Sequence, residues 1–255
     1  MRVRFLGTGT SNGVPVIGCD CEVCRSTNLK DKRLRSSVLI EAEDTRLLID
    51  CGPDFRQQAL SIPFEKFDGV LLTHIHYDHV GGIDDLRPYC KLGDIDLFAN
   101  EATCQGLRNN LPYCFTEQLY PGVPRLNLHT ISPRKYFRVG NLDILPFEVM
   151  HGNLPILAYR IGQLTYITDM KTINTIDKDC VAGTEVLIIN ALRWEREHHS
   201  HHLVDEAIAF SQEVGAKRVY LTHLTDRIGL HDEVQKRLPT SVFLAYDGLV
   251  LDMDE

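Results

Sequence analysis

The sequence predicts an α/β fold organised as a single domain, and three of its features lead to this prediction. The chain has 255 residues, of which 44% are hydrophobic, enough to bury a sizeable core. Strand-like and helix-like segments recur along its whole length. No linker rich in Pro, Gly or Ser, no low-complexity tract and no fixed-period repeat interrupts them. We therefore expect one domain over residues 1–255.

The strands are predicted from two patterns. Val3-Arg4-Phe5-Leu6 largely alternates apolar and polar side chains, as a half-buried strand does, whereas Val70-Leu71-Leu72 is continuously apolar, as a buried strand is. Such patterns predict strands at residues 2–6, 37–41, 46–50, 69–73, 95–99, 142–149, 156–161, 164–168, 185–190, 217–222, 242–245 and 248–252.

Helices are predicted at residues 82–90, 101–109, 203–214 and 231–237. The clearest of them is the third, because Leu203, Ala207, Phe210 and Val214 form one apolar stripe. Acidic residues occupy its first turn, where the helix dipole favours them, and Gly215 follows as a C-cap.

A loop directly after the strand at 69–73 carries His74, His76, Asp78 and His79. The end of the strand can present His74 and His76 on one side, while the next turn brings Asp78 and His79 to the opposite side. One segment can therefore serve two neighbouring ions. Neutral imidazole binds zinc, iron, manganese and nickel, and a carboxylate extends the choice to harder ions that activate water. The alternative, a merely solvated polar loop, fits this density of ligands behind a buried strand poorly.

The spacing His-x-His-x-Asp-His resembles the signature of the metallo-β-lactamase superfamily. Its members are four-layer αβ/βα sandwiches with a site for one or two metal ions at one edge of the sheets. The resemblance implies three further ligands at the ends of predicted strands, His151, Asp169 and His223. The implied set is His74, His76 and His151 for one divalent ion, Asp78, His79 and His223 for a second, and Asp169 between the two.

Cys19, Cys21 and Cys24 form a second cluster, in a small loop at residues 19–24. Three closely spaced thiols predict a structural zinc site that needs a fourth ligand. The chain has the features of a cytosolic protein, which disfavours a disulfide framework; reduced, unliganded thiols are the alternative. The other cysteines are expected to be small core or surface residues: Cys51, Cys90, Cys104, Cys114 and Cys180.

The opening Gly7-Thr8-Gly9, the following Pro-bearing loop and Cys-x-Cys-x-x-Cys ahead of the histidine loop together resemble the PhnP-like phosphodiesterases, over nearly the whole chain. That family places its fourth zinc ligand three residues after the last catalytic histidine, usually as another His. This chain has Asp226 there, so Asp226 is the expected ligand, with His231 or another residue as the alternative. The glycines alone do not make a dinucleotide site, because Asn12 stands where that fingerprint needs glycine.

The resemblance implies a metal-dependent phosphodiesterase acting on a small phosphate diester, such as a cyclic ribose phosphate. Two divalent ions, manganese or zinc, would hold a bridging hydroxide that attacks phosphorus, with one structural zinc elsewhere. Asp78, counted here as a catalytic residue, and Asp169 offset part of the metal charge. They leave a locally positive pocket although the formal net charge of the chain is −8.

The same resemblance places a catalytic histidine shortly before the helix at 203–214. His201 is the best match, with His199 and His202 as alternatives in register. Its expected task is to protonate the departing oxygen or to hold the substrate phosphate. Arg193 and Arg196 are either phosphate-binding residues or ordinary surface arginines.

Three other functions are less compatible with the sequence. A tRNA 3′-processing endonuclease shares the metal loop, but the chain is acidic, shows no long basic Gly/Pro-rich arm and has a cysteine cluster that fits the PhnP-like branch better. A diiron redox protein usually needs a flavin domain, for which 255 residues leave no room. A non-catalytic metal-binding protein would have lost ligands, and this chain keeps them.

The sequence also predicts where the protein is located and what it binds. No apolar core of signal-peptide length follows Met1, and no run of about eighteen apolar residues occurs. We therefore expect a soluble, cytoplasmic protein without a membrane partner. Its expected partner is a small phosphodiester rather than nucleic acid, and the resemblance suggests a homodimer.

Overall fold

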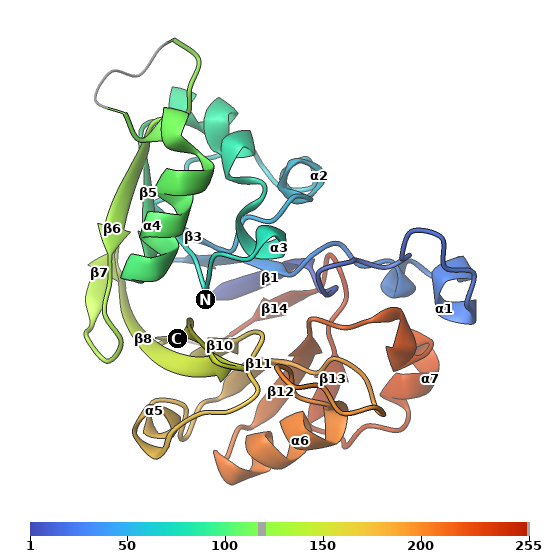
Figure 1. The fold of residues 1–255 in the computed structure, drawn as a ribbon. Coiled ribbons are helices and arrows are strands. Elements are labelled where there is room, and N and C mark those ends of the chain that lie inside the picture. Colours follow the sequence, from blue (N-terminus) through green and yellow to red (C-terminus); the bar gives the residue numbers. More distant parts are fainter. Residues whose placement is uncertain (117–120, 254–255) are drawn as a thin grey trace.

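The computed structural model describes residues 1–116 and 121–253, and two seven-stranded sheets dominate it (Figure 1). In hydrogen-bonded order the first sheet consists of β14 (Val250–Asp252), β1 (Arg2–Gly7), β2 (Ser37–Ala42), β3 (Thr45–Ile49), β4 (Gly69–Leu71), β5 (Ile95–Ala99) and β6 (Leu126–Thr130). The second consists of β13 (Val242–Leu244), β12 (Arg218–Thr222), β11 (Val186–Asn190), β10 (Leu164–Ile167), β9 (Leu154–Ile161), β8 (Leu142–His151) and β7 (Phe137–Val139).

Helices cover the outer face of each sheet (Figure 1). The α-helices are α1 (Glu22–Arg25), α2 (Phe55–Ala59), α3 (Tyr77–Val80), α4 (Glu101–Asn110), α5 (Thr175–Asp179), α6 (Val204–Glu213) and α7 (His231–Gln235). Turns of 3₁₀ helix span Leu29–Asp31, Ile83–Lys91, Pro112–Cys114 and Asp226–Ile228.

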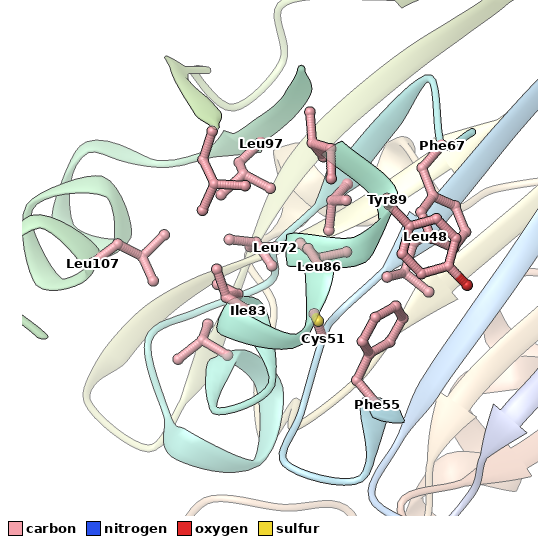
Figure 2. Packing of buried hydrophobic residues seen from close by; sticks show 14 of the residues in the cluster. Leu48, Cys51, Phe55, Phe67, Leu72, Ile83, Leu86, Tyr89, Leu97 and Leu107 are labelled. Carbon is pink, nitrogen blue, oxygen red and sulfur yellow. The ribbon is translucent and has the colours of Figure 1, made fainter. Parts of the chain in front are cut away.

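Three clusters of buried apolar residues lie between the layers. One fills the space between the first sheet and the helical segments over it, where Phe55, Phe67 and Tyr89 pack together (Figure 2). A second lies between the two sheets, and a third lies between the second sheet and its helices, including α6. Helices, sheet, sheet and helices therefore stack as the expected four-layer αβ/βα sandwich.

The alternation of side chains along each strand explains why both faces of each sheet are buried. In β3, Leu48 joins the cluster under the helices, whereas Leu47 and Ile49 enter the cluster between the sheets. In β11, Leu187 and Ile188 divide in the same way between the outer and the inner cluster. Successive residues point to opposite faces, so a strand covered on both sides must be apolar throughout.

The predicted strands are all present, with ends shifted by a few residues. Two strands were not predicted, β6 and β7. Both lie at the edge of a sheet, β7 has only three residues, and β6 leaves most of its side chains exposed or half-buried, so neither has the apolar pattern of a central strand. The predicted helix at 82–90 is a 3₁₀ run instead, with Pro88 inside it.

The clearest predicted helix is confirmed as α6, with Val204, Ala207 and Phe210 buried and Gly215 at φ +70° just beyond its end. The unpredicted α1, α2, α3 and α5 have four or five residues each, too few to show an amphipathic period. Within residues 1–116 and 121–253 there is no helix both long enough and apolar enough to cross a membrane.

Candidate metal centre

The predicted metal ligands come from loops at the carboxyl ends of strands in both sheets. The histidine loop follows β4, Asp169 follows β10, His223 follows β12, and His151 is the last residue of β8. Because β10 and β12 both run parallel to β11, which lies between them, their carboxyl ends meet at one edge of the second sheet. The fold therefore brings together side chains that lie far apart in the sequence.

The first group consists of His74, His76 and His151, whose ring nitrogens can converge on one ion. Nε2 of His74 lies 3.0 Å from Nδ1 of His76, and the rings of His76 and His151 lie 5.1 Å apart. His151 is fixed from behind, because its Nδ1 lies 2.9 Å from the carbonyl oxygen of Ser200. That bond leaves its Nε2 for a ligand.

The second group consists of Asp78, His79 and His223. Nε2 of His79 lies 3.2 Å and Nε2 of His223 lies 3.5 Å from the same carboxylate oxygen of Asp78. The two imidazoles stack with an interplanar angle of 14°. These three donors face one point, as ligands of a second ion would.

Asp169 lies between the two groups. One of its oxygens is 3.2 Å from Nε2 of His79 and the other is 3.3 Å from Nε2 of His223. Asp169 also converges with His74 of the first group and His79 of the second, which links the two groups. The hydroxyl of Thr168 donates to the first oxygen at 2.6 Å. A carboxylate in this position can bridge two cations.

Unpaired nitrogens show that the residues of this centre fit metal ions. Nε2 of His79 and both ring nitrogens of His223 are buried without a hydrogen-bond partner among the described residues. A buried polar atom without a partner is costly, and a cation within bonding reach would satisfy the deprotonated ring nitrogen of each histidine. The donor set of imidazoles and carboxylates is one that zinc and manganese accept.

The charges of the protein alone point the same way. Burial lowers the pKa of His74 well below its usual value, helped by His79, so His74 is the neutral imidazole that a metal needs. Burial opposes the charge of Asp169, but His223 and His79 hold its pKa well below the ordinary range. Burial likewise works against a charged His79, whose pKa is nevertheless raised well above normal by Asp78, Asp169 and Asp50.

Asp50 is a member of the centre that the sequence analysis missed. Its carboxylate is fully buried, lies 2.7 Å from Nδ1 of His79 and accepts hydrogen bonds from the backbone N–H and the hydroxyl of Thr73. It therefore orients the ring so that Nε2 faces the second group. The available signal was a carboxylate at the end of the strand predicted at 46–50.

Three residues of the centre adopt left-handed backbone conformations that are uncommon for non-glycine residues. Asp50, Asp169 and His223 have φ of +60°, +55° and +56°, each directly or almost directly after a strand. Such conformations cost about 1–3 kcal/mol each and cluster at functional sites. In each case the turn of the backbone accompanies a side chain that contacts another residue of the centre.

Among the three candidate histidines before α6, only His201 reaches the centre. Its Nδ1 lies 3.6 Å from Asp169, and its ring stacks on His223 at 5.0 Å. His202 points elsewhere, with Nε2 3.1 Å from the carbonyl oxygen of Lys171, and His199 is exposed. Burial lowers the pKa of His201 to about 3 against the opposing charge of Asp169, so the ring is neutral in the protein alone.

The cysteine cluster assembles at the other end of the segment that follows β12. Cys19, Cys21 and Cys24 lie together with Asp226, one of whose oxygens is 3.5 Å from Sγ of Cys19 and 3.7 Å from Sγ of Cys21. Burial raises the pKa of Cys24 to about 12, so a bound cation is needed to keep it a thiolate.

The alternative ligand His231 does not take part in this cluster. It lies beside the buried Arg33 at 3.5 Å, and its backbone N–H donates to Asp31. Of the remaining cysteines, Cys51, Cys90, Cys104 and Cys114 are buried in the cluster of Figure 2 and Cys180 is half-buried, as expected of small packing residues.

Comparison with known proteins agrees with this architecture. The model of the β-lactamase superfamily domain matches residues 45–224, most of the chain. The chain therefore belongs to the metallo-β-lactamase superfamily. A crystal structure described as a new diphosphatase from the PhnP family superposes with a TM-score of 0.92 and 34% identity, covering 99% of this chain and 98% of that one. Within the superfamily, the chain belongs to the PhnP-like branch.

Two relatives carry other names. A protein of Porphyromonas gingivalis named octanoyltransferase is 44% identical over 256 residues, covering 100% of this chain but 52% of that protein. The chain thus spans about half the length of this relative. A ribonuclease Z of Methanopyrus kandleri is 26% identical over 298 residues, covering 98% of this chain and 96% of that protein.

Proposed function

We propose that this hydrolase cleaves a phosphate diester of small-molecule size, using two divalent cations held by the seven predicted ligands. The observation that carries the proposal is the position of Asp169, within 3.3 Å of ligands from two strand ends and flanked by both histidine groups. When bound, the cations supply an activated water and neutralise charge that gathers on the phosphoryl oxygens. The similarity to a PhnP-family diphosphatase supports phosphoryl chemistry.

The residues around the centre define what the chain itself contributes. Asp78 and Asp169 offset only part of the charge of two cations, so the pocket still attracts an anionic phosphate. His201 stands next to Asp169 at the rim of the ligand set. As the bond between phosphorus and the attacking oxygen forms, the bond to the leaving oxygen breaks and His201 donates a proton to that oxygen. An anionic substrate beside His201 raises its pKa and so helps it to carry that proton.

The test combines metal analysis with hydrolysis of bis(p-nitrophenyl) phosphate, a panel of cyclic phosphates and a diphosphate. Asp169→Ala should lower turnover by about 10²–10³-fold, because loss of the ligand shared by the two cations weakens the electrostatic stabilisation that they supply. His201→Ala should lower it by about 10²-fold or more, as loss of a general acid does. His199→Ala is the matched control, since this exposed neighbour should leave turnover unchanged. Unaltered turnover in His201→Ala would remove that residue from the chemistry.

A second candidate is processing of tRNA 3′ ends, favoured by the full-length similarity to a ribonuclease Z. Faster cleavage of precursor tRNA than of any small diester would establish it in place of the first. Octanoyl transfer is not part of the proposal, because about half of the relative with that name lies outside the matched region.

We also propose that the chain acts in the cytoplasm as a homodimer with a small-molecule substrate. The cytoplasmic location, the homodimer and the small-molecule substrate stay predictions of the sequence, as does the single domain over residues 1–255. Light scattering during gel filtration would give the mass of the particle. A mass equal to that of one chain would contradict the dimer.

A further inference from the structure

A cavity of about 460 Å³ lies in the loops that follow β11 and β12, next to the segment that carries His201. Four arginines line it, together with Trp194 and a single acidic residue, Glu195. The arginines are Arg193, Arg196, Arg227 and Arg237. We call this site the arginine cavity. No step of the proposed reaction uses it.

The arginine cavity and the metal centre share the same two segments of chain. Hydrogen bonds join these segments, because the hydroxyl of Thr225 donates to the carbonyl oxygen of Leu192 at 3.0 Å and Nε1 of Trp194 donates to that of Ile228 at 3.1 Å. Two residues beyond Arg196, the ring of His198 packs on His201 at 4.8 Å. A ligand in the cavity would therefore lie beside the metal centre, at the carboxyl ends of the strands.

Within residues 1–116 and 121–253, no carboxylate forms an ion pair with the guanidinium groups of the cavity. The ion pairs of arginine among the described residues all involve other arginines. Arg193 donates to the backbone carbonyls of Glu195 and Arg196, which shapes the loop and leaves the charge uncompensated. Partial burial lowers the pKa of Arg193, as do the nearby charges of Arg227 and Arg196. The remaining three arginines are exposed, and Arg237 lies over the ring of Trp194.

Clustered guanidiniums repel one another. The net charge of the chain is −8, so a lack of carboxylates does not explain why these arginines have no acidic partner. An anion offsets this repulsion. Guanidinium presents paired N–H groups that match the oxygens of a phosphoryl group, and several guanidiniums together match its multiple charges. We propose that the arginine cavity is a binding site for a phosphoryl group beside the metal centre.

The only tryptophan of the chain reports on this site directly. Trp194 lines the cavity, and the guanidinium of Arg237 lies over its ring at 4.5 Å from the centroid. Titrating metal-free protein with pyrophosphate should therefore give a saturable change in tryptophan emission. The measurement needs neither bound metal nor turnover, so a failure of the proposed reaction leaves its outcome unaffected.

The test variant is Arg196→Gln with Arg227→Gln, which removes two exposed charges and keeps Arg237 on the indole. The matched control is Arg56→Gln with Lys135→Gln, which removes two exposed charges elsewhere. Loss of two charge-assisted contacts should weaken pyrophosphate binding at least tenfold in the test variant and hardly at all in the control. Equal melting temperatures would show that both variants are folded. An emission change that is absent, or that is the same in wild type and test variant, would overturn the proposal.

Two sources of the phosphoryl group are distinguished by kinetics, and this part rests on the proposed function. If it is a second phosphate on the substrate, the test variant should raise KM at least tenfold for a diester that carries a remote phosphate. KM for the same diester without that phosphate should not change. If it is a free phosphate ion, added phosphate should alter turnover of the plain diester in the wild type but not in the test variant. Neither effect, despite turnover of both diesters, would contradict a link between the cavity and the reaction.

Discussion

Asp50 offers a decisive perturbation of the metal centre, because it contacts His79 from behind without facing the ions. In Asp50→Asn the side chain keeps its shape but loses its charge, and its amide cannot accept from His79 and from both donors of Thr73 at once. A charge-assisted hydrogen bond of this kind contributes about 1.5–3 kcal/mol, which corresponds to roughly ten- to hundredfold in binding. Substitutions behind metal-ligating histidines typically cost about the same, 10–100-fold.

We therefore expect Asp50→Asn to bind its active-site metals about 10–100-fold more weakly, measured by competition with a chromophoric chelator. Turnover at limiting metal should fall with occupancy and recover partly at high metal concentration. Asp54→Asn is the matched control, since the carboxylate of Asp54 forms its 2.9 Å ion pair with Arg35 rather than with a ligand histidine. If Asp50→Asn binds metal as tightly as the wild type, the assignment of Asp50 as the residue that orients His79 is wrong.

Three more predictions concern the zinc cluster, the pH dependence of stability and the loop that carries the ligands. Cys24→Ala should lose the structural zinc and melt at a lower temperature than the wild type. Cys180→Ala should keep the zinc content and the melting temperature of the wild type, and equal zinc contents in the two variants would contradict the cluster. Burial lowers the pKa of His231 from 6.5 to about 4, and the charges of Arg33 and Lys30 act in the same direction. The charges of Asp232 and Asp31 oppose this shift. The folded chain keeps this ring neutral while the unfolded chain protonates it. His231 thus contributes stability that is complete above pH 6.5 and is lost as the pH falls toward 4, by up to about 3 kcal/mol. Over this pH range, denaturation should show that His231→Asn loses less unfolding free energy than the wild type, by the amount that His231 contributes. An equal loss in both proteins would refute the reasoning. In Gly52→Ala the new methyl would stand 2.0 Å from the carbonyl oxygen of Asp78, so the variant should lose about 1–3 kcal/mol of unfolding free energy along with metal affinity, and unchanged values of both would contradict it.

The central strands could be predicted because a strand buried on two faces must be apolar. The ligands beyond the histidine loop follow from the family resemblance, which directs attention to the polar residues just after such strands, as Asp169 and His223 are. The edge strands β6 and β7 lack that contrast, since much of their surface faces solvent. The same holds for the short helix α3, whose Tyr77–Val80 turn is set by the ligand loop rather than by an apolar period.

The parts of the site that the sequence does not reveal depend on where a side chain points rather than on which type of residue carries it. The family resemblance favours His201 and leaves His199 and His202 as alternatives in register, and the path of the loop then brings His201 beside Asp169. Asp50 is one carboxylate among many until its contact with His79 is seen. The left-handed turn at each strand end is invisible to patterns of hydrophobicity, because Asp and His do not favour φ above zero as glycine does.

The central claim is that seven side chains hold two divalent cations around Asp169. Anomalous diffraction from crystals grown with manganese tests it most directly. We expect one peak among His74, His76 and His151, a second among Asp78, His79 and His223, and Asp169 in contact with both. A single peak, or peaks that Asp169 does not contact, would contradict it.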